Sequence, residues 1–309
     1  MFANLGIALT KLAAAWASGS SALLSEGVHS LVDSCNELLL LHGMRRSRAR
    51  RSRQHPLGHG REVYFWSFIV ALLVFSLGAG VSIFQGVEHL RQPEANRHPM
   101  LSYAVLAISA LFDGYSFAVA LRQFRADKGR RGYLMAIEQS KDPTSFAVLL
   151  EDGAALVGIA IAALGVALAQ LLGDPRFDAA ASIGIGCVLA CTAALMARES
   201  KALLIGESAA PEVEAAILAL VSQDPDVSHA NGVITFHLAP RQIVAAVSVA
   251  FAPQLTTAEV ETCSARLERT LRAEHPQVTL VFLKPETRLA FERSSVVREL
   301  DGGDRQQAS

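Results

Sequence analysis

The chain has 309 residues, of which 51% are hydrophobic and 18% charged, and its formal net charge is -1 at pH 7. Its mean hydropathy of +0.32 excludes an ordinary soluble domain, and the charged fraction excludes a protein built from membrane spans alone. Long apolar runs and basic patches alternate up to about residue 200, and the remainder resembles a soluble domain. The small net charge therefore averages two unlike parts and indicates nothing about partners.

The first part of the chain contains six apolar runs of roughly the length that a helix needs to cross a bilayer, about 20 residues each. They lie near residues 1–18, 21–43, 62–90, 100–124, 143–171 and 178–200. The first run resembles a secretory signal, but such a signal opens with a basic region and this run does not. We therefore predict a membrane all-α transmembrane domain of six helices over residues 1–204.

The charges of the connecting loops predict the orientation of these helices. Seven arginines lie between positions 45 and 61, and six lysines or arginines lie between positions 122 and 141. The loops near 91–99 and 172–177 carry little positive charge. By the positive-inside rule both basic loops face the cytoplasm, so six spans place both termini there. Nucleic-acid binding by the arginine run is the alternative, but membrane topology already accounts for the charge.

From about residue 205 the pattern changes to that of a small α+β domain. Helices are predicted over 212–221 and 256–274, and strands over 227–237, 242–251 and 278–283. The order helix-strand-strand-helix-strand suits a ferredoxin-like domain with both helices on one sheet face. We expect this cytoplasmic domain to occupy residues 205–288, and a disordered tail to occupy residues 289–309.

The second apolar run carries a histidine and an aspartate four positions apart, His29 and Asp33. Residues at this spacing share one helix face, so an imidazole and a carboxylate project together from a predicted spanning helix. Ionisable groups in such helices are costly and usually face the protein interior or a water-filled path. The alternative interpretation is a polar contact between helices.

Two adjacent acids, Glu151 and Asp152, lie in the fifth apolar run. They point about 100° apart on a helix, so they need not share a role. If Asp152 faces His29 and Asp33 across a helix pair, the three side chains offer one nitrogen and two carboxylate ligands. This set suits zinc or another first-row divalent ion. The alternative is a carboxylate cluster that only relays protons, or one that is tied to Lys11.

Three motifs together carry a resemblance to a known family. They are His29-Ser-Leu-Val-Asp33, His55-Pro-Leu-Gly-His59-Gly-Arg61 and Leu-Leu-Glu151-Asp152-Gly-Ala-Ala. Together they resemble the cation diffusion facilitator family of divalent-metal transporters, and the third motif resembles its zinc transporter 9-like branch. The resemblance covers almost the whole chain. It implies six spans, a ferredoxin-like cytoplasmic domain that forms a homodimer, and a transport metal held between the second and fifth spans.

The resemblance also implies a set of metal ligands, two on each of these spans in an i, i+4 arrangement. His29 and Asp33 match the second-span pair, and Asp152 matches the distal acid of the fifth span. The proximal fifth-span position falls at Val148, which cannot coordinate a metal. The fourth ligand is then a water, Glu151, or another intramembrane acid. The candidates for that acid are Asp113 and Glu26.

Two further charges in the apolar runs need an explanation. A lysine in a spanning helix requires a carboxylate or an interfacial position, and for Lys11 we expect pairing with an intramembrane acid. For Asp113 we expect a structural role, or a place in the water path, ahead of direct metal binding.

Resemblance to the family implies two further metal sites. His55 and His59 match loop histidines that hold a secondary metal, although the expected acid is replaced by Ser52, and a surface turn is the alternative. Several members carry a dinuclear zinc site in the cytoplasmic domain. Asn231, Ser248 and Lys284 stand where those members have histidines. We expect this domain to lack the zinc cluster and to dimerise through packing.

The function implied by the resemblance is efflux of a divalent metal, most of all Zn²⁺, in exchange for protons by alternating access. Bound metal needs a neutral imidazole and ionised carboxylates, so metal and protons compete for the same groups. Mn²⁺, Fe²⁺ or Co²⁺ are alternative substrates, because two carboxylates and one imidazole are less zinc-selective than a histidine-rich site. The expected partners are the lipid bilayer and a second copy of the chain, with no nucleic acid and no organic substrate.

Composition and the apparent lack of an organellar presequence favour a multi-pass protein of a bacterial inner membrane, and we expect no enzymatic activity. Two rival functions come from other classes. One is an intramembrane metal-dependent hydrolase with Glu151 as base, although a His-Glu-x-x-His motif is missing from the sequence. The other is a non-transporting scaffold or partner subunit, which Val148 in place of a ligand makes credible.

Overall fold

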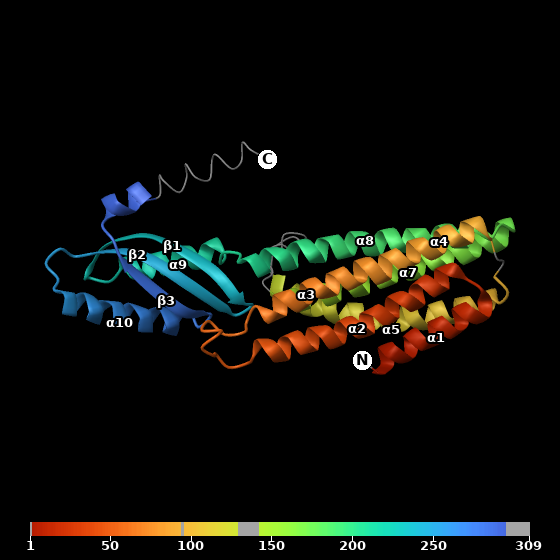
Figure 1. Cartoon of the computed structure of the whole chain (residues 1–309), viewed down its shortest axis with the longest axis horizontal. Helices are drawn as coiled ribbons and strands as arrows, with labels where there is room; N and C mark the ends of the chain where they lie inside the picture. The colour runs from red at the N-terminus through yellow and green to blue at the C-terminus, as the bar shows by residue number, and fades with distance from the viewer. Residues whose placement is uncertain (1, 94–95, 129–141, 295–309) are drawn as a thin grey trace. The chain divides into compact units, whose positions relative to one another are not determined.

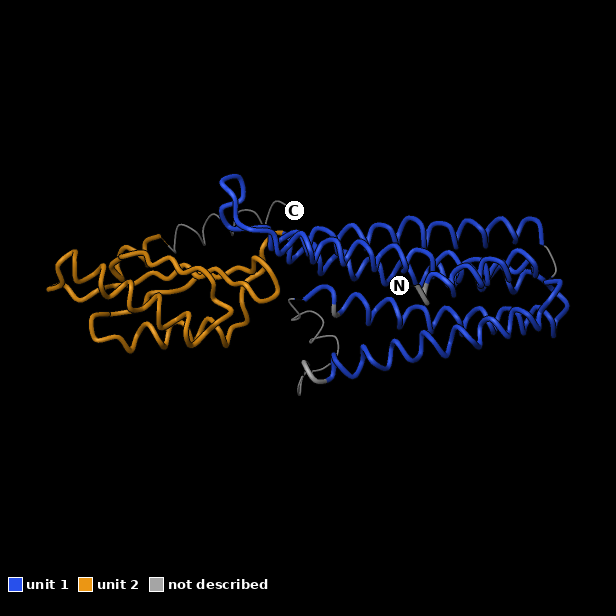
Figure 2. Tube along the Cα trace, turned by 90° about the horizontal axis from the view of Figure 1, so that it is seen from below, with its two compact units in different colours: residues 1–204 blue, residues 205–309 orange. Residues whose placement is uncertain are grey.

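The computed structural model describes residues 2–93, 96–128 and 142–294. The chain divides into two compact units, Met1–Leu204 and Ile205–Ser309 (Figure 2). Some predicted features lie outside the described residues, namely Arg130, Arg131 and Lys141 of the second basic loop and positions 295–309 of the tail.

The first unit is built from long helices (Figure 1). In chain order they are α1 (Phe2–Ser18), α2 (Ser21–Ser47), α3 (Glu62–Leu73), the π-helical segment η1 (Val74–Ala79), α4 (Gly80–Arg91), α5 (Pro99–Lys128), α7 (Pro143–Leu172) and α8 (Arg176–Ile205). Because α3, η1 and α4 follow one another without a break, they form one continuous helix. Each of the six predicted apolar runs is thus helical.

Four helices of the described chain are long and apolar enough to cross a membrane. They are Glu62–Arg91, Pro99–Arg125, Phe146–Leu172 and Arg176–Ile205. The apolar part of α1 is shorter, at Leu5–Ser18, and α2 carries acidic and imidazole side chains along its length. A six-span count therefore depends on α1 and α2 and stays a prediction.

The start of α2 is fixed by a carboxylate from α8. Asp178 accepts hydrogen bonds from Ser20 Oγ at 2.8 Å and from the backbone N–H of Ser21 at 2.7 Å. A negative charge at this end satisfies free N–H groups and interacts favourably with the helix dipole. Beyond this point α2 packs against α1, α3, α4 and α7. Several of its polar side chains, Glu26, His29 and Asn36 among them, are therefore buried among other helices of the unit.

The second unit contains α9 (Pro211–Ser222), β1 (Val227–Ala239), β2 (Gln242–Phe251), α10 (Thr257–Glu274) and β3 (Val278–Pro285) (Figure 1). The described strands form a sheet in the order β1-β2-β3, with β1 and β2 antiparallel and β2 and β3 parallel. A parallel pair needs a crossover connection, and α10 supplies it.

Both helices of this unit share a core with the same strand. Alternate residues of β2 from Ile243 to Val249 are buried together with Ile217 of α9 and Leu267 of α10, as the period of two along a strand requires. The predicted order of helices and strands is confirmed. The ferredoxin-like assignment stays a prediction.

The predicted disordered tail is wrong for its first residues, because residues 288–294 are helical. Phe291 of this segment packs against β1 at Gly232, where an added Cβ would lie 2.7 Å from the phenyl ring. The contact removes an aromatic side chain from water, which offsets the entropy lost on ordering the segment. A polar composition from residue 289 onward concealed this one apolar anchor.

Candidate metal site

His29 and Asp33 lie on one face of α2, as their spacing predicts. His29 Nδ1 is 3.3 Å from Asp33 Oδ1. The histidine is buried, and its Nε2 has no hydrogen-bond partner among the described residues. Asp33 is more open, with 24% of its side chain exposed. The imidazole therefore lies next to the carboxylate, and its Nε2 is available to act as a metal ligand.

Asp33 lines a cavity of about 170 Å³ that α1, α2, α5 and α7 enclose. Two more carboxylates reach the same cavity, Asp113 from α5 and Asp152 from α7. The remaining lining residues are Ile7, Ser30, Phe112, Tyr115, Ser116 and Ala155. Three acids from three separate helices thus face one small space within the helical unit.

Asp152 is held by a hydroxyl of the neighbouring helix. Ser116 Oγ donates a hydrogen bond of 2.7 Å to Asp152 Oδ2. The structure thus brings Asp33 and Asp152 to one cavity, and His29 lies next to Asp33. The ligand atoms of these three residues do not yet converge within 4.8 Å of one another. Coordination of one ion by all three therefore requires their side chains to close on it.

Glu151 and Val148 lie apart from the cavity. Glu151 is buried and accepts a hydrogen bond of 2.8 Å from Asn36 Nδ2 of α2, and it is absent from the cavity lining. The angular separation expected from Asp152 is thus seen. Val148 is 39% exposed and offers no ligand atom. The role of Glu151 as a fourth ligand gains no support from this arrangement.

Lys11 pairs with intramembrane acids, which confirms the expectation for this side chain. It is fully buried, and its Nζ donates a hydrogen bond of 2.8 Å to Ser30 Oγ. The same nitrogen lies 3.3 Å from Glu26 Oε2 and 3.5 Å from Asp113 Oδ2. Both intramembrane acids proposed as a fourth ligand are therefore already engaged by a cation.

Sequence reasoning missed the polar side chains that hold these acids in place. Ser116 holds Asp152, Asn36 holds Glu151, and Ser30 holds Lys11. Only Asn36 gave a signal, since an amide within an apolar run needs a partner. Single serines are common in membrane helices, so the sequence did not indicate a role for Ser116 or Ser30.

Comparison with known proteins decides the family. Residues 1–205 match the family described as the cation efflux transmembrane domain. The chain belongs to the cation diffusion facilitator family. It is a multi-pass membrane protein, and the resemblance carried by its motifs is confirmed.

Several named relatives are similar to the chain. The proton-coupled zinc antiporter SLC30A9, mitochondrial, of Mus musculus is 32% identical over 212 residues, which is 68% of this chain and 37% of the relative. Metal tolerance protein C4 of Arabidopsis thaliana is 34% identical over 195 residues, 62% of this chain and 43% of the relative. The cation-efflux pump FieF of Serratia proteamaculans is 26% identical over 239 residues, 76% of this chain and 74% of the relative.

The match covers only part of the mouse and Arabidopsis relatives. The match covers 37% of the mouse protein and 43% of the Arabidopsis protein. The mouse and Serratia relatives are named as an antiporter and an efflux pump, and none of the three names is that of an enzyme, so the hydrolase alternative gains no support. The family assignment holds for the membrane unit, which carries all of the candidate transport ligands.

The secondary site predicted for this family falls in the loop after α2. The rings of His55 and His59 have centroids 4.3 Å apart, and Gly58 makes the bend with φ of 89°. His59 Nδ1 is 3.9 Å from Glu62 Oε1. The structure thus brings the two imidazoles together and adds an acid that sequence reasoning did not consider. Metal binding here stays a prediction.

In the second unit, a polar network fills the position where the predicted zinc site is altered. Asn231 Nδ2 donates to Ser248 Oγ at 3.1 Å, and Ser248 Oγ donates to Glu286 Oε2 at 2.9 Å. Lys284 Nζ lies 2.7 Å from the other oxygen of Glu286. An amide, a hydroxyl and an ammonium group are poor ligands for zinc. These residues do not fit a dinuclear zinc site.

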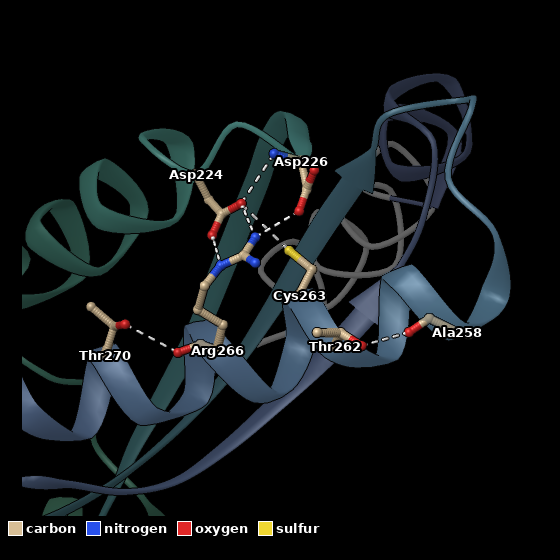
Figure 3. A network of polar contacts seen from close by, with 7 residues as sticks. All are labelled: Asp224, Asp226, Ala258, Thr262, Cys263, Arg266 and Thr270. Carbon is tan, nitrogen blue, oxygen red and sulfur yellow. Dashed lines mark hydrogen bonds and ion pairs between the residues drawn. The ribbon is translucent and has the colours of Figure 1, made fainter.

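One further acidic cluster lies in the second unit (Figure 3). Asp224, Asp226 and Cys263 are the described residues whose ligand atoms come within 4.8 Å of one another. Arg266 donates through Nε to Asp224 at 2.9 Å and through Nη2 to Asp224 and Asp226 at 2.7 Å. These bonds lower the pKa of Asp224, and burial raises the pKa of Cys263 to about 11. The guanidinium occupies the acids and the thiol stays protonated, so the cluster anchors α10 to the turn before β1.

Proposed function

We propose that the chain exports a divalent cation from the cytoplasm in exchange for protons, with Zn²⁺ as the preferred substrate. His29, Asp33 and Asp152 hold the ion, and a water completes the coordination. The observation that carries this proposal is the cavity shared by Asp33 of α2 and Asp152 of α7, in a chain of the cation efflux family.

The donor set supports a divalent first-row metal. Two carboxylate oxygens and one imidazole nitrogen match the ligand types that zinc uses, and an open fourth position is typical of sites that exchange their ligands. Mn²⁺, Fe²⁺ and Co²⁺ are the alternative substrates, because carboxylates also suit these ions. One relative is named as a proton-coupled zinc antiporter, which favours zinc and proton exchange.

Proton exchange follows from the same side chains. Metal binding requires a neutral His29 and ionised Asp33 and Asp152, so an arriving proton and a bound metal exclude each other. The ion enters when the cavity opens to one side, and protons replace it when the cavity opens to the other. Rocking of α1, α2, α5 and α7 around the acids would produce these openings.

The remaining features of the proposal concern the assembled protein. Six spans with cytoplasmic termini satisfy the positive-inside rule for both basic loops. Residues 205–288 form the cytoplasmic domain, through which two copies pair. A bacterial inner membrane is the proposed location, and the named relatives include both mitochondrial and bacterial proteins.

A second function is supported by one specific observation. Val148 supplies no ligand and is 39% exposed, so the fifth-span helix offers one donor to the cavity where the family has two. A chain with a weakened site serves instead as a non-transporting partner subunit. This function predicts weak metal binding and no flux.

The deciding experiment measures metal flux in sealed proteoliposomes with an imposed proton gradient. Zn²⁺, Mn²⁺ and Co²⁺ are compared for the wild-type chain, Asp33→Asn and Asp152→Asn. We expect gradient-dependent flux of Zn²⁺ in the wild type and a loss of more than about tenfold in each variant, since even outer partners of metal ligands cost this much.

The matched control is Glu212→Gln, which removes an exposed carboxylate of α9 and should leave flux unchanged. Flux that persists in Asp33→Asn and Asp152→Asn would place the transport site elsewhere. Absence of flux with every ion, in a folded preparation, would reject the exporter and favour the partner subunit.

A further inference from the structure

A buried ion triad lies beside the proposed metal cavity and has no part in the ligand set. Lys11 of α1 is fully buried between Glu26 of α2 and Asp113 of α5, at 3.3 and 3.5 Å. A charge in the interior of a membrane unit is costly and marks a functional site unless paired. Here Lys11 is shared by two acids, Glu26 and Asp113, so one cation faces two carboxyl groups.

The two acids of the triad differ in their freedom to move. Glu26 is fully buried, and its Oε1 lies so close to α7 that a Cβ added at Gly158 would collide with it. That oxygen has no hydrogen-bond partner among the described residues. Asp113, in contrast, is 22% exposed and lines the cavity. Glu26 is therefore fixed, and Asp113 is the acid able to turn toward a metal.

Once a metal enters the cavity, Asp113 can pair either with Lys11 or with the metal. Its carboxylate shares the cavity with Asp33 and Asp152, and one of its oxygens faces Lys11. A metal held by all three acids and His29 would have four protein ligands and no exchangeable position. Such closed coordination is typical of structural sites, whereas an open position allows exchange.

We propose that Lys11 sets the metal affinity of the transport site by holding Asp113 away from the bound ion. The lysine is a resident cation that competes with the metal for one carboxylate and keeps the fourth coordination position open. This inference rests on the proposed function. It also agrees with the absence of a ligand at Val148, because neither this position of the fifth span nor Asp113 fills the fourth coordination position.

The test measures Zn²⁺ affinity of the purified full chain by competition with a chelating dye. Loss of Lys11 alone would leave Glu26 and Asp113 without their cation and destabilise the fold. The informative variant is therefore Lys11→Met with Glu26→Gln, which removes one cation and one anion together. Its matched control is Glu26→Gln alone, which keeps the pair between Lys11 and Asp113.

We expect the double variant to bind Zn²⁺ at least about tenfold more tightly than the control, because Asp113 is released from Lys11 and can take the fourth coordination position. Metal release, and with it flux per protein, should slow. Adding Asp113→Asn should abolish the gain. A purely structural lysine would lower stability without raising affinity, so a gain distinguishes the two roles.

A second measurement keeps Lys11 in place. Asp113→Asn in the wild-type background should weaken Zn²⁺ binding much less than Asp33→Asn does, because Lys11 already withholds Asp113. Unchanged or weaker affinity in the folded double variant, or an Asp113→Asn loss equal to that of Asp33→Asn, would overturn the inference while wild-type flux leaves the exporter intact. A wild type that binds no metal would remove both.

Discussion

The hydrogen bond between Ser116 and Asp152 makes a quantitative prediction about the metal site. Ser116→Ala removes the donor to Asp152 Oδ2, which lies at 2.7 Å. A hydrogen bond to a charged group contributes about 1.5–3 kcal/mol, and the exposure of Ser116 places this bond at the lower end. Since about 1.4 kcal/mol corresponds to a factor of ten, we expect Zn²⁺ affinity to fall about tenfold.

The sign follows from what the serine does for the carboxylate. Partners of metal ligands fix the orientation of the ligand, and their removal weakens metal binding by about 10–100-fold. The assay is a Zn²⁺ titration of the purified chain, with Ser109→Ala as the control, because Ser109 is a buried serine on the same helix. Equal affinities of Ser116→Ala and Ser109→Ala would refute the reasoning, and tighter binding by Ser116→Ala would reverse it.

Three other predictions concern stability. Gly86→Ala should destabilise the membrane unit by about 1–3 kcal/mol, because its Cβ would lie 2.8 Å from a carbonyl oxygen of α8; thermal unfolding in detergent checks this against Gly114→Ala, whose Cβ would make only an ordinary contact at 3.9 Å with Leu156. Thr256→Ala should cost about 0.5–2 kcal/mol, because it removes the capping box of α10; hydrogen exchange of that helix reports the loss. Arg266 lowers the pKa of Asp224 below its ordinary value of 3.8, so this ion pair stabilises the fold fully above that pH and less as pH falls through the lowered value. The difference in unfolding free energy between the wild type and Asp224→Asn should therefore be largest above pH 3.8 and should shrink as pH falls; denaturant unfolding at several pH values measures it, and a difference that does not change with pH would contradict the reasoning.

Much of the candidate site could be predicted from spacing within single helices. His29 and Asp33 share a face because they are one helical turn apart, and Glu151 and Asp152 separate because neighbours point about 100° apart. The structure agrees with both, since Asp152 reaches the cavity and Glu151 contacts Asn36. Relations of this kind need no knowledge of how helices pack.

Relations between helices could not be predicted in the same way. The partners of Lys11 depend on how α1 packs against α2 and α5, and several acids in the sequence were equally suitable. The contact between Ser116 and Asp152 joins α5 to α7, and nothing in the local sequence of either helix indicates it. The helical residues 288–294 were likewise missed, because a single contact of Phe291 with the sheet decides their conformation.

The two helices that fall short as apolar spans carry several buried ionic groups. Lys11 lies in α1, and Glu26, His29 and Asp33 lie in α2. A hydropathy average treats each of these side chains as if it faced lipid. Lys11, Glu26 and His29 are instead buried within the unit. Their cost is offset by ion pairs and hydrogen bonds among the helices, not by exposure to water. α1 therefore falls short of a span in length and α2 in apolarity, and the polar side chains that lower the apolarity of α2 include His29 and Asp33, which the proposed function uses to hold the ion.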